Sequence, residues 1–255
     1  MSDESKNDKP AENRSRVQRV RHELKRRELQ VLRVESVTPH YRSVTFTGEA
    51  LADFISASFD DHLKLILPGT DGAEAPVMRD YTPRRYDNQD RELTVEFALH
   101  GDGPAADWAA QAEAGQSVTI GGPRGSFIIP LDYDWHLFVG DETALPAVAR
   151  RLEELPAGAR AIAVLRTDEA ADERSFGTRA ELSLQWVRSD NALLDAVRAL
   201  ALPIGEGYAW CAGEAATMAA LRRILVDEKG HDRQAIRAAA YWKRGAVAHH
   251  QNLED

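Results

Sequence analysis

The chain has 255 residues, of which 43% are hydrophobic and 29% are charged, so it can form one large domain or two domains of ordinary size, each with a core. Its formal net charge of −9 argues against a general nucleic-acid binder and against a protein held on anionic membranes. The single cysteine, Cys211, excludes an internal disulfide, and no apolar run approaches the ~18 residues that a membrane-spanning helix needs. Because the polar N-terminus has no apolar signal segment, we expect a cytoplasmic protein. We also expect a monomer without nucleic-acid partners or membrane insertion.

Residues 1–22 are polar and are predicted to form a flexible segment. A basic stretch overlaps its end, with Glu23 as the one acid. Its basic residues are Arg14, Arg16, Arg19, Arg21, Lys25, Arg26 and Arg27. Such a stretch is either a solvated, partly helical lead-in or a cationic flap that attracts an anionic ligand.

Residues 28–130 have the pattern of a β-structure. Short apolar runs, several of them alternating, are separated by turn signals such as Thr47-Gly48 and Pro68-Gly69. The runs lie at residues 29–34, 41–46, 63–67, 93–97 and 118–120. Several short strands at this spacing are typical of a small barrel. Residues 105–114 interrupt the pattern and are predicted to form a short helix capped by Gly115.

From residue 134 to residue 240, strand-like runs alternate with amphipathic helical segments. The strand-like runs are 136–139, 161–165, 184–187 and 208–211, and the helical segments are 145–155, 193–200 and 218–225. This alternation predicts a parallel sheet with helices on its faces, which binds ligands beyond the carboxyl ends of its strands. The turns at 140–143 and 212–214 are therefore the expected ligand loops. The chain lacks a G-x-G-x-x-G motif, which excludes the usual dinucleotide fingerprint.

The segment Arg79-Asp80-Tyr81-Thr82-Pro83 gives the most specific functional signal in the chain. Because side chains alternate along an extended strand, Arg79 and Tyr81 share one face. A guanidinium beside an aromatic ring and a hydroxyl can bind a diphosphate and lay a flat ring system against the tyrosine, as flavin binding requires. The alternative is an ordinary strand with a buried tyrosine and an exposed arginine.

Together with five further segments, in this order and spacing, the Arg79 segment resembles the siderophore-interacting proteins, a family of ferredoxin reductase-like flavoenzymes, and among them the NADPH-dependent ferric siderophore reductases. The further segments are His100–Trp108, Gly121–Ser126, Asp141–Ala147, Gly213-Glu214 and Tyr241-Trp242. The resemblance runs from about Val17 to Gly245. It implies a six-stranded antiparallel FAD-binding β-barrel followed by a parallel-sheet α/β NAD(P)H-binding domain. The expected divisions are a flexible segment 1–22, the FAD domain 23–132, the NAD(P)H domain 133–246 with a C-terminal helix, and a polar tail 247–255.

The resemblance also implies which residues bind the cofactors FAD and NADPH. Thr143 and Ala144 are expected to border the flavin ring, and Gly213 and Glu214 to lie near the nicotinamide. Arg166, at the end of a strand, is the candidate for the 2′-phosphate of NADPH, with NADH as the alternative donor. The full predicted cofactor-binding set is Arg79, Asp80, Tyr81, Thr82, His100, Gly103, Pro104, Ala105, Gly121, Thr143, Ala144, Arg166, Gly213 and Glu214.

Four cations are the candidates for binding the substrate: Lys64, Arg124, Lys243 and Arg244. In the resembled reductases a basic cluster near the flavin edge attracts ferric siderophores, which are commonly anionic. A basic patch on an acidic protein would act as a focusing site. Each of the four residues is equally compatible with an ordinary solvated surface cation.

The resemblance implies a ferric siderophore reductase acting on a ferric siderophore or another ferric chelate. Hydride would pass from NADPH to FAD, and single electrons would then reduce Fe(III) and release Fe(II). Because the flavin carries this chemistry, no catalytic residue is expected from the protein. The scattered histidines and the lone cysteine indicate no protein-bound metal or iron–sulfur cluster. Two alternatives remain open, a general flavin-dependent electron-transfer reductase linked to ferredoxin or free flavin, and a non-catalytic siderophore-binding protein.

Overall fold

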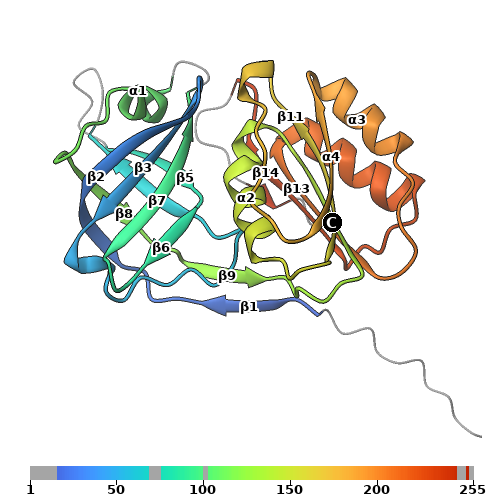
Figure 1. Ribbon diagram of the computed structural model, residues 1–255, viewed down its shortest axis with the longest axis horizontal. Helices are drawn as coiled ribbons and strands as arrows, with labels where there is room; N and C mark the ends of the chain where they lie inside the picture. The colour runs from blue at the N-terminus through green and yellow to red at the C-terminus, as the bar shows by residue number, and fades with distance from the viewer. Residues whose placement is uncertain (1–15, 69–75, 100–102, 246–250, 253–255) are drawn as a thin grey trace, which may run out of the picture.

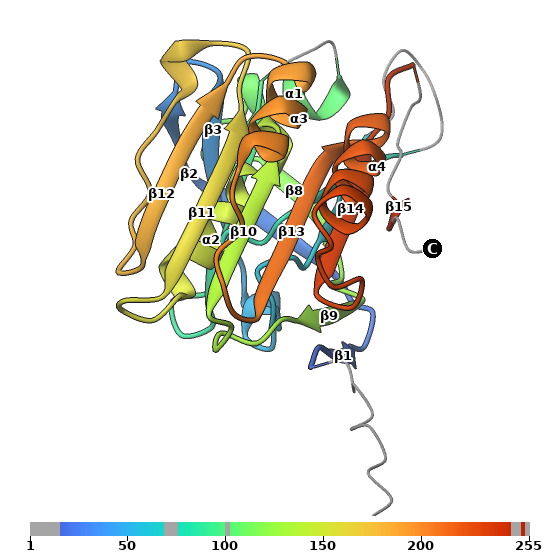
Figure 2. The ribbon, with the colours of Figure 1, turned by 90° about the vertical axis from the view of Figure 1, so that its right-hand side faces the viewer.

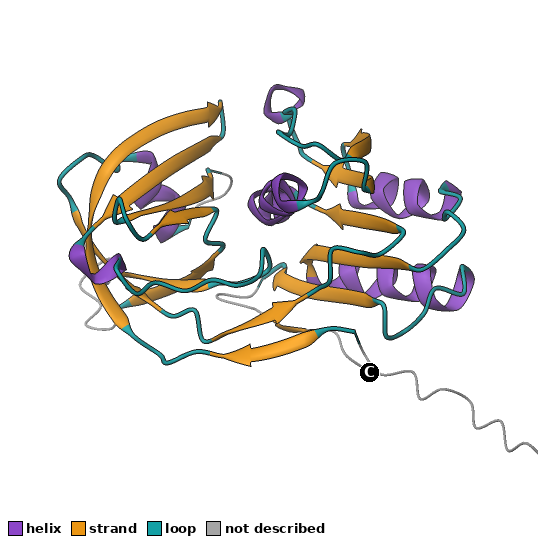
Figure 3. Cartoon of the chain, turned by 60° about the horizontal axis from the view of Figure 1, so that its bottom comes forward, coloured by secondary structure: helices purple, strands orange, loops and turns teal. Residues whose placement is uncertain are grey.

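The computed structural model describes residues 16–68, 76–99, 103–245 and 251–252. A β-rich first domain and an α/β second domain lie side by side (Figure 1). A two-stranded ribbon of β1 (Gln18–Arg21) and β9 (Gly125–Ile128) runs along one side of both (Figures 1 and 3). Within the described ranges, no helix is long and apolar enough to cross a membrane.

The first domain is a curved antiparallel sheet in the order β5-β4-β8-β2-β3-β7-β6. Its strands are β2 (Arg26–Thr38), β3 (Tyr41–Thr47), β4 (Leu63–Leu67), β5 (Val77–Tyr81), β6 (Arg85–Asp87), β7 (Glu92–Ala98) and β8 (Ser117–Gly121). Burial alternates along these strands, as in β2, where Leu29 and Val31 enter the core while Glu28 and Gln30 face water. The prediction of six strands missed β6, because this short polar edge strand has no apolar signal. In the described residues no ladder joins β5 to β6 to close a barrel.

The predicted helix in this domain is shorter than expected. Helix α1 (Pro104–Ala110) ends five residues before Gly115. Gly115 has a φ of +89° and donates its N–H to the Val31 carbonyl at 2.8 Å. It therefore forms the turn that returns the chain to the sheet and does not cap the helix, because its N–H bonds to a strand.

The second domain has a six-stranded sheet in the order β12-β11-β10-β13-β14-β15 (Figure 2). Five strands are parallel, and β15 adds antiparallel to β14. The strands are β10 (Trp135–Gly140), β11 (Arg160–Arg166), β12 (Glu181–Val187), β13 (Gly207–Glu214), β14 (Ile236–Trp242) and β15 (Gln251–Asn252). Every residue of β10 and β13 is buried, because central parallel strands are covered on both faces.

Helices cover both faces of this parallel sheet. Helix α2 (Leu145–Glu154) lies between the sheet and the first domain, whereas α3 (Asp190–Ala199) and α4 (Ala215–Arg223) cover the outer face (Figures 1 and 2). The helical path continues from α4 as a π-turn to Glu228. This arrangement confirms the expected α/β fold and leaves the carboxyl ends of β10, β11 and β14 open toward the first domain.

Both ends of the described chain differ from expectation. The segment 18–21, assigned to the flexible part, is strand β1, because β9 offers it a free edge and Arg16 anchors it through ion pairs with Asp132 and Glu206. The prediction of a partly helical lead-in is therefore wrong for residues 18–21. Residues 1–15 lie outside the described ranges. At the other end the predicted C-terminal helix is replaced by β14, and part of the predicted polar tail forms β15.

The contact between the domains is built around two buried arginines of α2. Arg150 donates to the Ser56 hydroxyl and the Pro83 carbonyl, both at 2.8 Å, and to the Ser56 carbonyl at 2.9 Å. Arg151 donates to both carbonyls of the 129–130 linker. Buried guanidinium groups are tolerated only when they are paired or hydrogen-bonded, so these bonds hold the domains in one orientation. That orientation shapes the space between them.

Candidate functional site

A cavity of about 620 Å³ lies between the two domains, at the carboxyl ends of the parallel strands. This is the edge at which open parallel sheets bind ligands. The first domain contributes Tyr41, His62, Arg79, Asp80, Tyr81, Thr82, Glu96, Ala98, Gly103, Ala105 and Ala106 to its wall. The second domain contributes Glu142, Thr143, Pro146, Arg166, Asp168, Tyr241 and Trp242.

Strand β5 brings the predicted Arg79 segment to this wall. Arg79 is half-buried and donates from Nη1 to the Met78 carbonyl at 2.9 Å. In the part of the chain that is described, no carboxylate lies within 4 Å of its guanidinium, so its charge is available to an anion. The Tyr81 ring packs against Phe97 with 4.4 Å between ring centroids, and the Thr82 side chain is buried beside it. A cation, an aromatic ring and a hydroxyl therefore line the cavity together.

A buried carboxylate, Asp141, organises the opposite wall. Its Oδ2 accepts the indole N–H of Trp242 at 2.8 Å and the Glu214 N–H at 2.9 Å, while Oδ1 accepts the Thr143 N–H at 3.0 Å. Burial raises the pKa of Asp141 above its ordinary value, and these hydrogen bonds act against that rise. Gly213 is required next to it, because a Cβ there would stand 2.4 Å from Asp141 Oδ2 and φ is +151°.

Glu142 and Arg166 face each other inside the cavity. Glu142 Oε2 makes no hydrogen bond in the described structure and lies 3.8 Å from Arg166 Nη1. Burial, followed by the nearby charge of Asp141, raises the pKa of Glu142 to about 7. Arg166 also pairs with Asp168 and, at 3.4 Å, with Asp190. Its Nε and Nη1 nevertheless make no hydrogen bond among the described residues.

Eight of the predicted cofactor-binding residues meet at this cavity: Arg79, Asp80, Tyr81, Thr82, Gly103, Ala105, Thr143 and Arg166. Five others do not line it: Pro104, Gly121, Ala144, Gly213 and Glu214. Ala144 is fully buried, and the Glu214 carboxylate caps α4 by accepting the N–H groups of Ala216 and Thr217. His100 lies outside the described residues. The binding roles assigned to these residues stay predictions.

The four predicted substrate cations lie outside the cavity lining and differ in surroundings. Lys64 donates to both oxygens of Asp80, at 2.7 and 2.9 Å, so its charge is balanced across the β4–β5 ladder. Arg124 is exposed in the β8–β9 turn, three residues after Gly121, which pairs with Lys64. Lys243 and Arg244 follow Trp242, and the Arg244 guanidinium binds Asp190 at 2.6 Å.

Several lining residues were not predicted as site residues, including Tyr41, His62, Glu96 and Glu142. Glu96 had a signal, since it is an acid within the apolar run 93–97, and it pairs with Arg84 at 3.1 Å and Arg174 at 2.7 Å. Glu142 also had a sequence signal, because it follows a buried strand. It was not predicted as a site residue because an acid at the start of a helix is already explained by the helix dipole. Tyr41 and His62 have no local signal, since only the packing of the two domains brings them to the cavity.

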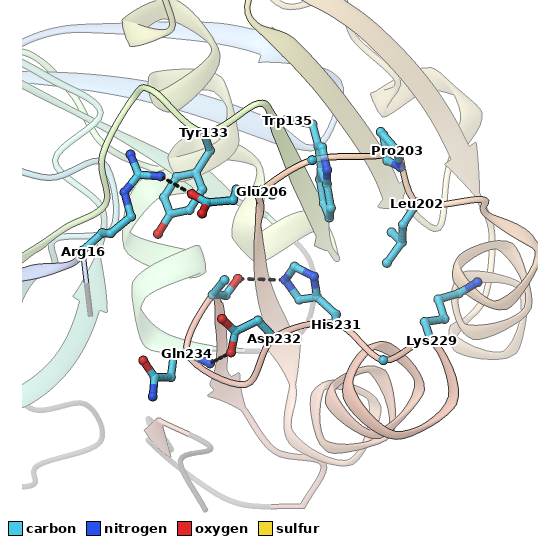
Figure 4. Close-up of a pocket in the computed structure, with 14 residues that line it drawn as sticks. Arg16, Tyr133, Trp135, Leu202, Pro203, Glu206, Lys229, His231, Asp232 and Gln234 are labelled. Carbon is cyan, nitrogen blue, oxygen red and sulfur yellow. Dashed lines mark hydrogen bonds and ion pairs between the residues drawn. The ribbon is translucent and has the colours of Figure 1, made fainter. Parts of the chain in front are cut away.

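A second cavity, of about 410 Å³, lies at the amino ends of the parallel strands (Figure 4). Trp135 and His231 lie in its wall with ring centroids 5.4 Å apart, and His231 Nε2 bonds the Ala235 carbonyl at 2.9 Å. Arg16 binds Glu206 beside Tyr133. None of the predicted site residues lies here, and parallel sheets place nucleotide sites at the other edge.

The residues of the inter-domain cavity fit a flavin dinucleotide. Arg79 presents a guanidinium without a carboxylate partner among the described residues, and Arg166 presents N–H groups without hydrogen bonds. A Cβ at Gly103 would meet nothing within 4 Å, so the chain leaves room at that wall. Aromatic, apolar and cationic groups thus surround a space of the size that cofactor pockets have. Among the described residues, no cluster of histidine, cysteine or acidic side chains suits a metal ion.

Comparison with known proteins agrees with this geometry. The family model described as siderophore-interacting FAD-binding domain matches residues 30–75 and 69–127, and the model described as siderophore-interacting protein matches residues 133–245. The chain is 36% identical to an NADPH-dependent ferric-chelate reductase of Escherichia coli K12 over 88% of this chain and 96% of that protein. It is 31% identical to a ferric vibriobactin reductase of Vibrio cholerae, over 85% of this chain and 89% of that protein.

The fold also matches a solved structure. The crystal structure of a siderophore utilization protein from T. fusca superposes with a TM-score of 0.85 and 33% identity, covering 91% of this chain and 98% of that one. The two family models together span most of the described residues, and a ferredoxin reductase of a carbazole dioxygenase shares the fold with a TM-score of 0.61. The chain belongs to the siderophore-interacting protein family and carries its FAD-binding domain.

Proposed function

We propose that this protein is an NADPH-dependent, FAD-containing ferric siderophore reductase. The observation that carries the proposal is the inter-domain cavity, which is lined by Arg79, Tyr81 and Thr82 of one domain and by Thr143 and Arg166 of the other. We assign FAD binding to residues 23–132 and nucleotide binding to residues 133–246. Bound FAD would supply the chemistry by accepting a hydride and passing on its two electrons singly.

The chain's own residues bind, orient and exclude water. Arg79 supplies positive charge to a phosphate, and Tyr81, locked against Phe97, gives a flat ring a rigid surface. Asp141 positions Thr143 and Trp242 on the nucleotide side. Arg150 and Arg151 keep the two walls at a constant separation, so both ligands are brought into contact without domain closure.

The substrate we propose is an anionic ferric siderophore or a related ferric chelate. Support comes from the exposed Arg124 and Lys243 and from the names of the relatives, a ferric-chelate reductase and a ferric vibriobactin reductase. The overall reaction is NADPH + 2 Fe(III) → NADP⁺ + H⁺ + 2 Fe(II). Oxygen-rich chelators hold the harder ferric ion more tightly, so reduction releases the metal.

Anaerobic rapid mixing tests the proposal. Purified protein with FAD should be bleached by NADPH, then recover its yellow absorbance when a ferric siderophore is added, with Fe(II) appearing in a ferrous chelator. NADH in parallel reports donor preference. A protein that transfers electrons to ferredoxin or free flavin but not to ferric chelates would be a general electron-transfer reductase. Tight binding of ferric siderophore without NADPH oxidation would identify a non-catalytic binding protein, and either result would overturn the proposal.

A further inference from the structure

The reaction just proposed leaves one proton behind inside the cavity. A hydride carries one proton and two electrons, and only the electrons move on to the two ferric ions. The proton must therefore reach solvent from a buried space. A side chain that can take it up and release it near neutral pH is needed, because general acid–base groups work best when their pKa lies near the working pH.

The acids of the cavity wall differ in how strongly they are held. Four described acids line it: Asp80, Glu96, Glu142 and Asp168. Asp80 binds Lys64 at 2.7 Å, and Asp168 pairs with Arg166. Glu96 lies between Arg84 and Arg174. Each of these three carboxylates therefore has a cation in close contact. Glu96 Oε2 and Glu142 Oε2 are both buried without a hydrogen bond in the described structure. Arg174 lies only 2.7 Å from Glu96 Oε2, whereas the cation paired with Glu142 Oε2, Arg166, is 3.8 Å away.

The surroundings of Glu142 balance its two protonation states. Burial and the Asp141 charge favour the neutral carboxyl, whereas Arg166 favours the carboxylate, and the pKa settles at about 7. The Glu142 backbone is fixed in position, because the Tyr41 hydroxyl donates a hydrogen bond to the Glu142 carbonyl. The other titratable or charged side chains facing the cavity are Tyr41, His62, Arg79, Tyr81, Arg166 and Tyr241. Asp168, which pairs with Arg166, has a half-exposed side chain.

We infer that the Glu142 carboxylate takes up the proton left by electron transfer to iron and releases it to solvent before the next turnover. The inference rests on the proposed function, because it names the group that completes its proton balance. Glu142 Oε2 gains the proton and returns it to water, and no further oxidant or reductant is involved. Glu142 thus acts as a proton acceptor beside the bound cofactor.

A titration tests the carboxyl without any turnover. Protein labelled with ¹³C at the glutamate carboxyl and loaded with oxidised FAD should show one resonance that titrates near pH 7. That resonance should be absent from Glu142→Gln and present in Glu181→Gln, which removes an exposed glutamate at the start of β12. If no glutamate titrates above about pH 6, or if the resonance persists in Glu142→Gln, the inference is overturned.

A second experiment follows proton-linked electron transfer. Protein photoreduced without NADPH is mixed with ferricyanide, which accepts single electrons and needs no siderophore pocket. We expect the wild-type rate to rise with pH through about 7 and the Glu142→Gln rate to be flat and at least ~10-fold lower at about pH 8. Glu142→Asp should keep the rising profile, and Glu181→Gln should match the wild type.

The outcomes separate this inference from the proposed function. A wild-type rate and pH profile in Glu142→Gln would refute the role of Glu142 and leave the reductase proposal intact. A normal ferricyanide profile combined with no reduction of any ferric siderophore would refute the proposed substrate and support the role of Glu142. A flat profile in Glu142→Asp as well would show that shape and not the carboxylate matters, which would also overturn the inference.

Discussion

Trp242 donates its indole N–H to Asp141 Oδ2 at 2.8 Å and thereby ties the end of β14 to the turn after β10. The same oxygen accepts the Glu214 N–H, and the other oxygen accepts the Thr143 N–H. One buried carboxylate therefore joins three segments at the carboxyl ends of the parallel strands. The nucleotide side of the cavity depends on this contact, because Thr143 and Trp242 are both part of its wall.

Trp242→Phe should lower the free energy of unfolding by about 1–3 kcal/mol, because a buried carboxylate loses one of its donors. Urea unfolding followed by circular dichroism measures the change. The matched control is Trp186→Phe on β12, a half-buried ring that stacks on Phe176. Equal losses in the two variants would show that ring volume and not the Asp141 bond is responsible.

Gly213→Ala should destabilise the protein more than Gly158→Ala. Both glycines have positive φ, but a Cβ at Gly213 would stand 2.4 Å from Asp141 Oδ2, whereas one at Gly158 meets nothing within 4 Å. The loss of unfolding free energy in Gly158→Ala thus measures the cost of positive φ alone, about 1 kcal/mol. The additional loss in Gly213→Ala measures the clash with Asp141. Thermal unfolding of both variants checks this. Similar melting temperatures would contradict the close packing of Asp141 against Gly213.

Glu142→Gln should stabilise the protein only at high pH. The folded pKa of Glu142 is raised from 4.5 to about 7, so its favourable contribution is complete below about pH 4.5 and is lost as pH rises through 7. The glutamine variant cannot ionise and should exceed the wild type by up to about 3 kcal/mol at pH 8. Urea unfolding at about pH 5 and pH 8 measures the difference. A constant offset at both pH values would mean that Glu142 does not titrate in this window.

Arg79→Gln should weaken FAD binding at least ~10-fold with little change in folding stability, because the guanidinium makes no ion pair in the described structure and is available to a phosphate. Titration of the FAD-free protein with FAD, followed by flavin fluorescence, measures affinity. Arg160→Gln removes an exposed arginine at the amino end of β11 and serves as the control. Unchanged affinity in Arg79→Gln would remove the central support for the proposed cofactor site.

The double variant Lys64→Glu, Arg124→Glu should lower kcat/KM for an anionic ferric siderophore at least ~10-fold, with the loss shrinking at high salt. Most of the effect should come from Arg124, because Asp80 already balances Lys64. Steady-state rates with each single variant and with Arg160→Glu as control separate the contributions. If kcat/KM is unchanged by both substitutions, the protein is better explained as an electron carrier that needs no basic pocket.

The Arg79 segment shows which features of the site a local sequence pattern can predict. Alternation along an extended strand was enough to predict that Arg79 and Tyr81 act together, and both line the cavity. The same pattern did not reveal that Asp80 binds Lys64, because that contact depends on the register between β4 and β5. The family resemblance, and not this pattern, placed Glu214 near the nicotinamide. Its carboxylate caps α4, and the binding role stays a prediction.

Glu142 shows the opposite case. Its position after a buried strand and beside Asp141 was visible in the sequence. The raised pKa of Glu142 depends mainly on its burial, and its approach to Arg166 exists only in the folded chain. Strand β1 was missed for a similar reason, since four exposed residues form a strand only because β9 lies beside them.

The sequence by itself determined most of the strands and helices, the division into a β-rich and an α/β part, and the family, because periodic burial and short motifs are local properties of the chain. Only the tertiary structure decided which side chains meet at the cavity, which cations are already paired, and how closely each buried carboxylate approaches a cation. Those properties arise from distances and burial between residues far apart in the chain, and electrostatic energies depend on both.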